Sequence, residues 1–135
     1  MNGVHVMMTI LRARQPLVAL VPAARIFAGT VPQNAELPAI GVTEIGRNGF
    51  QTLANAEPGT LVRARIQVTV HAKNYLSQKA VILAAKLGPG VHTGVIGGVK
   101  VRSVIRGDVG PDLSDEDAGI YQQSRDFMVS YIEPN

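Results

Sequence analysis

The stretch Val62-Arg-Ala-Arg-Ile-Gln-Val-Thr-Val-His-Ala72 decides the fold. Apolar and polar side chains alternate along it without a break, and successive side chains of a β-strand point to opposite sides of a sheet. One face of this strand is therefore apolar and the other is polar. Such alternation is typical of an antiparallel sheet that is covered on one side only. The sequence predicts a half-buried antiparallel strand over residues 60–72.

Helical periodicity precedes this strand. Apolar side chains recur at helical spacing near the start of the chain, at Val4, Met7, Met8 and Leu11. This spacing predicts a helix over residues 4–14. Pro16 is expected to end or restart the helix, because proline has no amide hydrogen to donate within a helix interior.

A second helix is expected directly after the strand. Asn74 is a suitable N-cap, because its side-chain oxygen can accept a hydrogen bond from the first backbone amides of a helix. Gly88-Pro89-Gly90 is expected to end the helix. The predicted apolar stripe of this helix consists of Leu76, Ala80, Leu83, Ala84 and Leu87.

The remaining strands are predicted from shorter patterns, over residues 25–31, 39–45, 99–106 and 120–132. Pro32 and Pro38 bracket the connection between the first two, because proline cannot donate to a strand ladder. The last strand alternates between an apolar face with Phe127, Val129 and Tyr131 and a second face with Asp126, Met128 and Ser130.

A projecting segment is expected between the second and third of these strands. Gly46-Arg-Asn-Gly49 predicts a turn, because Asn-Gly is a strong hairpin pair. The polar segment 50–59 that follows predicts an extended loop or a protruding hairpin arm.

The order of elements is helix, strands, helix, strands. It predicts one α+β domain over residues 1–135, with a mainly antiparallel sheet, two helices packed on one face and an extended hairpin arm or loop. A length of 135 residues agrees with one domain.

Composition narrows the classes of protein. Hydrophobic residues make up 46% and charged residues 17%, as in a globular chain. The net charge of +3 falls short of the dense basic patch of a dedicated nucleic-acid binder. The chain has no cysteine, so disulfides, thiolate metal sites and cysteine nucleophiles are all excluded.

The N-terminal apolar run does not predict a targeting segment. No basic residue precedes Val4–Leu11, and Arg12 and Arg14 interrupt the run before it could span a bilayer. We therefore expect neither a signal peptide nor a membrane helix.

Motifs for chemistry are weak. The glycine-rich link over residues 88–100 lacks the Gly-Lys-Ser/Thr order of a phosphate-binding loop, so a plain connection is expected. His5, His71 and His92 share no metal-ligand spacing. No Gly-x-Ser-x-Gly elbow is present. We expect no metal, no cofactor and no enzymatic activity.

Charged residues suggest contacts between copies instead. Arg63 and Arg65 lie on the polar face of the best strand, which helices on the other face leave free. An acidic loop is expected over residues 107–119, with Asp108, Asp112, Asp115, Glu116 and Asp117. Its spacing does not match a calcium-binding EF-hand loop. A solvated loop is one interpretation, and pairing with the arginines of a neighbouring subunit is the other.

Three segments carry a resemblance to a known family. They are Arg25–Val42, with its Val31-Pro32-Gln33-Asn34-Ala35 loop and Leu37-Pro38, then the strand and helix over Val62–Leu87, and finally Gly119–Tyr131, in which Asp-Phe precedes an alternating run to Tyr. In this order and spacing the chain resembles the tail-completion, tail-terminator or head-tail joining proteins of tailed bacteriophages. The link at 88–98 departs from the family, since it is longer and richer in glycine.

The resemblance implies a structural role. Members of the family cap the tail tube of a phage, stop its polymerisation and offer a surface to the head connector. They do so as a ring, typically of six copies, around a channel through which DNA passes without specific binding. The expected partners are other copies of the chain, the major tail tube protein and a head-connector or neck protein. The implied location is the tail or neck of the virion, and the host cytoplasm during assembly.

The resemblance also points to contact residues. Subunit-interface candidates are Arg63, Arg65, Asp112, Asp115, Glu116 and Asp117, because a cyclic ring joins two different patches. The candidates in the arm that would contact the tube or a neighbour are Arg47, Asn48, Phe50 and Gln51.

The alternative is a small ligand-binding or regulatory α+β domain of a bacterial protein. It would require a concave pocket with convergent polar groups. An enzyme would need a tight group of titratable residues, and the sequence assembles none.

Overall fold

A computed structural model describes residues 2–50, 59–86, 93–115 and 119–133. Its helices are α1 (Gly3–Arg12), α2 (Gln15–Val18) and α3 (Tyr75–Ala84), with a 3-10 turn at Ala23–Arg25. Its strands are β1 (Ile26–Ala28), β2 (Ala39–Phe50), β3 (Thr60–Ala72), β4 (Gly94–Ile96), β5 (Val99–Val109), β6 (Leu113–Asp115) and β7 (Ile120–Glu133). The α+β fold predicted from the sequence is confirmed.

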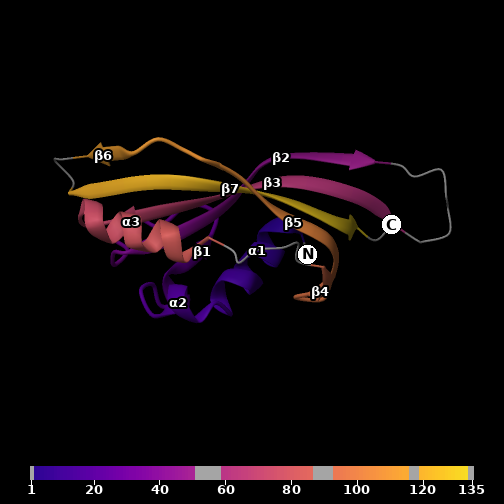
Figure 1. Cartoon of the computed structure of the whole chain (residues 1–135), viewed down its shortest axis with the longest axis horizontal. Helices are drawn as coiled ribbons and strands as arrows, with labels where there is room; N and C mark the ends of the chain where they lie inside the picture. Colours follow the sequence, from indigo (N-terminus) through magenta and orange to yellow (C-terminus); the bar gives the residue numbers. More distant parts are fainter. Residues whose placement is uncertain (1, 51–58, 87–92, 116–118, 134–135) are drawn as a thin grey trace.

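The strands form one curled sheet in the order β1-β2-β3-β7-β5-β4, and β6 pairs with the far part of β7. Every pairing is antiparallel except that of β1 with β2. The long strands β3 and β7 pair from Thr60 opposite Glu133 to Ala72 opposite Tyr121 and form the centre. The helices all lie on one side of the sheet (Figure 1), which we call the inner face. The opposite side is the outer face.

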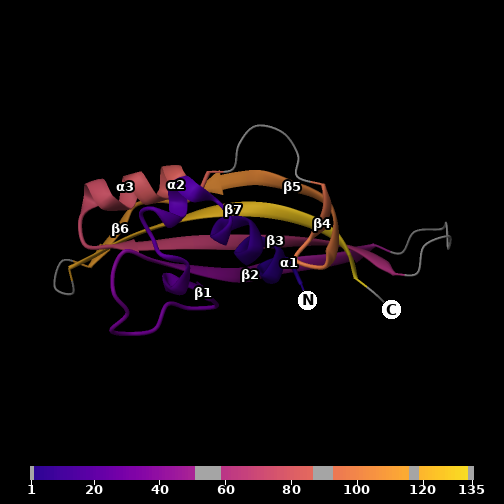
Figure 2. The same cartoon turned by 90° about the horizontal axis from the view of Figure 1, so that it is seen from below.

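The core lies between the inner face and the helices. Alternate side chains of β3 are fully buried there, as its pattern predicted. α1 contacts β1, β2, β3, β4 and β7, and α3 contacts β3 and β7, so the two longer helices pack at different places along the same central strands (Figure 2). The largest fully buried side chains are Tyr131, Phe127, Met7, Leu11, Leu17, Ile26, Ile40 and Ile66, together with the polar Gln78.

Side-chain caps define where the longer helices begin. Asn2 Oδ1 accepts a hydrogen bond from the amide of His5 at 3.1 Å. Asn74 Oδ1 accepts one from the amide of Ser77 at 2.8 Å, so the predicted N-cap is confirmed. Each cap satisfies an amide that the helix itself leaves without a partner.

The first two strands are parallel rather than a simple β-turn-β. Residues 29–38 return the chain to the start of β2, beside the start of β1. Gly29 donates its amide to Val42 O at 2.8 Å, and Arg25 Nη1 donates to Leu37 O at 3.2 Å. Gly41 permits this close crossing, because a Cβ there would lie 2.7 Å from Gly29 O. The prolines bound this connection, as the sequence predicted.

The predicted turn at 46–49 is wrong. β2 continues through these residues, with Asn48 opposite Arg63 and Gly49 opposite Val62, after a bulge between Glu44 and Gly46. Pairing with the long β3 outweighs the local preference of Asn-Gly for a turn. The β2–β3 hairpin extends beyond the helices (Figure 2), and its connection includes residues 51–58, which lie outside the described part.

The expected acidic loop is partly strand. β5 runs to Val109, and Leu113–Asp115 pairs with residues 120–122 of β7 as β6. The short strand β4 was also missed within the glycine-rich link, where Gly97 and Gly98 adopt positive φ and form a turn to β5. Residues 87–92 of that link lie outside the described part.

The predicted apolar stripe of α3 is only partly turned to the sheet. Ala84 packs against the core, Leu76, Ala80 and Leu83 do not, and Leu87 lies outside the described part. The buried side consists of Gln78, Val81, Ile82 and Ala85. At about 100° per residue, Leu76, Ala80 and Leu83 lie on the opposite side of the helix. Leu76 is 80% exposed and Leu83 is 66% exposed. The helix therefore presents apolar side chains on both of its sides.

Candidate functional site

No described helix covers the outer face of the sheet over β3 and β7, and this face is polar. Side chains of β3 that point there are Arg63, Arg65, Gln67, Thr69 and His71, as predicted. Opposite them on β7 lie Ser130, Met128, Asp126, Ser124 and Gln122. All three helices lie on the other side (Figure 1), so this face is available for contact along much of its length.

An ion pair crosses the middle of this face. Arg65 donates from Nη2 to Asp126 Oδ2 at 2.6 Å and from Nε to the same oxygen at 3.0 Å. The Asp126 side chain is only 10% exposed, whereas that of Arg65 is 48% exposed. The chain at Gly107 explains part of this burial, because a Cβ there would lie 3.3 Å from Asp126 Cβ. Arg65 thus neutralises a covered carboxylate and still presents part of its guanidinium outward.

A shallow polar pocket lies at the other end of the outer face. It is lined by Gly29, Thr30, Val31, Gly41, Thr43, Gln67, Thr69, His71 and Gln122. Thr69 and Ser124 share a hydroxyl hydrogen bond of 3.1 Å across the strands beside it. Partial burial lowers the pKa of His71 below its ordinary value of 6.5. The residues that line the pocket with it carry no charge, so none of them offsets that desolvation.

Among the acidic interface candidates, Asp112 pairs with a residue of α3 rather than with Arg65. Asp112 accepts from Lys79 and, at 3.4 Å, from the hydroxyl of Tyr75, so it fastens α3 to the link between β5 and β6. Lys79 Nζ also donates to Gln123 Oε1 at 2.9 Å. The hydrogen bond that Lys79 donates to Asp112 is the main reason that the pKa of Lys79 is raised. The side chain of Asp115 and residues 116–118 lie outside the described part.

The base of the projecting hairpin carries a second ion pair, between Arg47 and Glu133. Arg47 and Asn48 both belong to β2 and are exposed, whereas the side chain of Phe50 and the whole of Gln51 lie outside the described part. Tyr131 is buried beside this pair, and burial raises the pKa of its hydroxyl. Three of the predicted arm residues, Arg47, Asn48 and Phe50, are therefore strand residues at the base of the hairpin.

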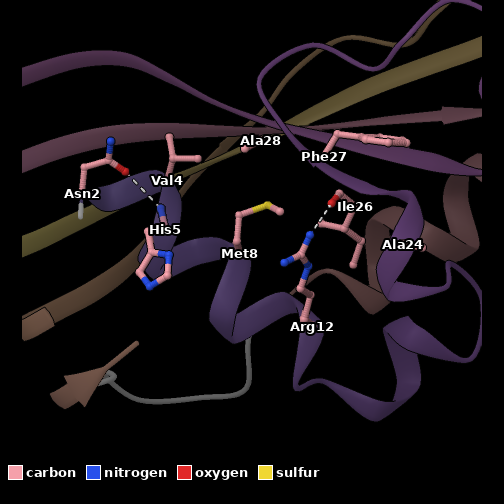
Figure 3. Close-up of a pocket in the computed structure, with 9 residues that line it drawn as sticks. All are labelled: Asn2, Val4, His5, Met8, Arg12, Ala24, Ile26, Phe27 and Ala28. Atoms are coloured by element: carbon pink, nitrogen blue, oxygen red, sulfur yellow. Dashed lines mark hydrogen bonds between the residues drawn. The ribbon is translucent and has the colours of Figure 1, made fainter. Parts of the chain in front are cut away.

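A cleft of about 430 Å³ opens between α1 and β1 (Figure 3). Its walls are Asn2, Val4, His5, Met8, Arg12, Ala24, Ile26, Phe27 and Ala28. The polar groups in it already have partners. Asn2 caps α1, His5 Nε2 lies 2.9 Å from Gly97 O, and Arg12 Nη2 donates to Ile26 O at 3.1 Å. The cleft does not supply the convergent polar groups that a ligand-binding domain would need.

Two further searches covered the described residues. No group of three or more His, Cys, Asp or Glu side chains gathers there in a way that could hold a metal ion. No helix in that part of the chain has the length and apolar character needed to span a membrane.

No protein-family model and no curated protein matches the chain. Its fold is similar to that of a chain in a solved structure, the virion of a native gene transfer agent particle. The TM-score is 0.68, and the superposition covers 96% of this chain and 94% of that chain. The sequence identity is 14%, so the likeness shows a shared fold.

The near-complete coverage shows how much of the fold the two chains share. A match over 96% of one chain and 94% of the other extends to the whole arrangement of curled sheet and one-sided helices. It therefore involves more than a common helix-strand fragment.

Two features of the molecular surface were not predicted from the sequence. It found the polar face of β3 but neither the partner of Arg65 nor the exposure of Leu76 and Leu83. The stripe of leucines on α3 was visible in the sequence, but it was assigned to the core. The polar Gln78 within the other stripe gave no hint that this second side would be the buried one.

Proposed function

We propose that the chain is a structural virion protein that caps a phage tail tube as a ring. In this role it ends tube polymerisation and provides the attachment surface for the head connector. The observation that carries the proposal is the likeness in fold, over almost the whole of both chains, to a chain of a gene transfer agent virion. The order of segments that resembles tail-completion proteins supports the same role independently.

The surface of the molecule suits assembly. A ring joins two different patches on each copy, repeated around an axis. The uncovered outer face and the extended β2–β3 hairpin leave large surfaces for such contacts (Figure 1). We propose six copies per ring, with a mass near six times the 14.3 kDa of one chain.

Charged residues are proposed to set the contact between copies. Arg63 and Arg65 of one copy would face the acidic segment of the next, with Asp112, Asp115, Glu116 and Asp117. Arg65 keeps 48% of its side chain exposed while paired with Asp126, and Asp112 keeps 46% exposed while paired with Lys79. Both groups can therefore take part in an extended ion-pair network across an interface.

The hairpin is proposed to contact the tail tube or a neighbouring copy. Arg47 and Asn48 lie in β2 near its projecting end, followed by Phe50 and Gln51. Main-chain pairing with β3 fixes the direction of this segment, so its side chains are positioned before contact. Shortening the hairpin tip is expected to disturb tail length or head joining while leaving the sheet intact.

The proposed ring would let DNA pass. A net charge of +3 is small, and tight phosphate binding would hinder passage. The partners in this proposal are the major tail tube protein and a connector or neck protein, and the role is structural rather than enzymatic. Assembly would take place in the host cytoplasm and end in the virion.

Electron microscopy of particles made without this protein tests the role. Overlong tails are expected if the protein ends polymerisation, and normal tails without heads if it acts only in joining. Complete particles of normal length would overturn the proposal. Symmetry of the tail end in wild-type particles tests the six-fold ring separately.

Charge reversal tests the proposed interface. Arg65→Glu would place a second negative charge beside Asp126. The test variant therefore combines Arg63→Glu with Arg65→Gln and Asp126→Asn. This variant is expected to form smaller oligomers, as measured by light scattering. Lys100→Glu, at an exposed position of β5, is the matched control and should keep the oligomeric mass. An unchanged mass with intact circular dichroism would contradict a role for this face.

A further inference from the structure

The outward side of α3 is an apolar stripe with no cover in the described structure. Leu76 and Leu83 are 80% and 66% exposed, and Ala80 between them is exposed as well. The other side of α3 is buried against β3 and β7. A helix that is apolar on both sides is normally buried on both. The stripe is therefore a candidate contact surface.

The charges beside the stripe are basic. Lys79 and Lys86 follow Leu76 and Leu83 by three residues, so each lies next to a leucine on the helix surface. Lys79 is already paired with Asp112. Lys86 is exposed just beyond the end of α3. A surface that covers this stripe would be apolar with an acidic residue at its margin.

The occupant that fits best is a second copy of the chain, an inference that rests on the proposed ring. A ring interface is heterologous, so the complement of α3 must lie on another flank of the molecule. Strands β5 and β6, which carry other exposed apolar residues, lie on the same flank as α3 (Figure 2). On β2, which is separated from them by β3 and β7, Ile45 is the large exposed apolar residue among the described side chains, at 46%.

The residues around Ile45 are complementary to the leucine stripe of α3, which has basic residues beside it. Ile45 is the extra residue of the bulge between Glu44 and Gly46, and it has no partner in the β3 register. Glu44 beside it is exposed and acidic. β1 pairs with β2 only up to Val42, so no described strand covers this side of β2 at the bulge.

We propose that the leucine stripe of α3 on one copy docks against the β2 bulge of the next copy. Leu76 and Leu83 would pack on Ile45, and Lys86 would face Glu44. Repetition of this contact from one flank to the other runs head to tail, as a closed ring requires.

The absence of cysteine makes a direct test possible. Leu83→Cys and Ile45→Cys are made in separate chains, both at exposed positions, and the two purified proteins are mixed and oxidised. We expect a disulfide-linked dimer in the mixture and little in either protein alone. A single chain that carries both cysteines is expected to give a series of disulfide-linked oligomers that ends at the size of one closed ring. Val95→Cys on β4, 71% exposed before substitution, replaces Leu83→Cys as the control for random collision.

The other outcomes overturn the proposal. Dimers of Leu83→Cys alone would mean that α3 pairs with α3 about a two-fold axis. Equal linkage with Val95→Cys, or no linkage, would mean that the stripe does not meet the bulge. A charge swap gives a second measurement. Lys86→Glu and Glu44→Lys are each expected to lower the oligomeric mass, and their combination to restore it.

Failure of this contact can be told from failure of the proposed role. If Leu83→Glu particles have normal tails and heads, the docking is wrong and the tail role stands. If particles without the protein are normal although the cysteine pair links, copies associate through the stripe but the tail role is wrong.

Discussion

Arg65 on β3 and Asp126 on β7 share one carboxylate oxygen, which receives hydrogen bonds from Nη2 at 2.6 Å and from Nε at 3.0 Å. The pair is asymmetric, because the aspartate side chain is 10% exposed and the arginine 48%. Removal of the arginine would leave a covered carboxylate without its cation. Most of the stability lost would come from the unpaired carboxylate of Asp126, because it is the more buried of the two groups.

Arg65→Met is therefore expected to lower the free energy of unfolding by about 1 to 3 kcal/mol, the usual penalty for a buried polar group that loses its partner. Asp126→Asn in the same chain should recover much of the loss, because an amide is less costly to leave uncovered than a charge. Urea denaturation of both single variants and the double variant measures the coupling. Additive effects of the two changes would show that the ion pair contributes nothing measurable.

Gly41→Ala tests the crossing of residues 29–31 over β2. The new Cβ would lie 2.7 Å from Gly29 O, a backbone atom that can move only with its segment. We expect a loss of about 1 to 3 kcal/mol, as for other overpacked sites. Gly46→Ala in the same strand is the matched control, since its Cβ would meet nothing within 4 Å. Equal melting temperatures for the two variants would contradict the close crossing.

The central strands could be predicted from the sequence because burial of one face imposes a period of two. The alternation along β3 and the Phe127, Val129 and Tyr131 series on β7 both indicate which side chains point to the inner face. Asn74 could also be predicted, since an N-cap depends on residues close in the chain. These features need no knowledge of distant partners.

Features that depend on distant pairing could not be predicted. Asn48-Gly49 favours a turn locally, but eleven residues of β2 pair with β3 and carry the strand through it. α3 has two candidate stripes, and only the sheet beneath it determines which is buried. Likewise, Arg65 and Asp126 are 61 residues apart, and the register that brings them together is not visible in either strand alone.

Gln78 offers a test of the buried side of α3. It is 1% exposed, and its Oε1 has no hydrogen-bond partner. Gln78→Met keeps a similar length and removes the unsatisfied amide, so we expect the free energy of unfolding to rise by about 1 kcal/mol. Gln67→Met on the outer face is the control and should change it by less than about 0.5 kcal/mol. Destabilisation by Gln78→Met would mean that the amide is satisfied in solution, for example by a water molecule.

His71 is expected to make stability depend on pH. Its folded-state pKa lies below 6.5, because burial beside uncharged residues disfavours the imidazolium. Between the folded value and 6.5, the unfolded chain binds more protons than the folded chain, so the free energy of unfolding rises with pH in that window. The stability that depends on a neutral His71 is therefore complete above about pH 6.5 and is lost as the pH falls through the folded pKa.

His71→Gln removes this titration while keeping a polar side chain of similar reach. The difference in unfolding free energy between the native chain and the variant should shrink as the pH falls from neutral toward 5. Urea denaturation at several pH values measures that difference, and an NMR titration of the His71 ring gives its folded pKa directly. A constant difference would show that folding does not shift the pKa of His71, and a ring that titrates above 6.5 would show that the outer-face pocket stabilises the imidazolium instead.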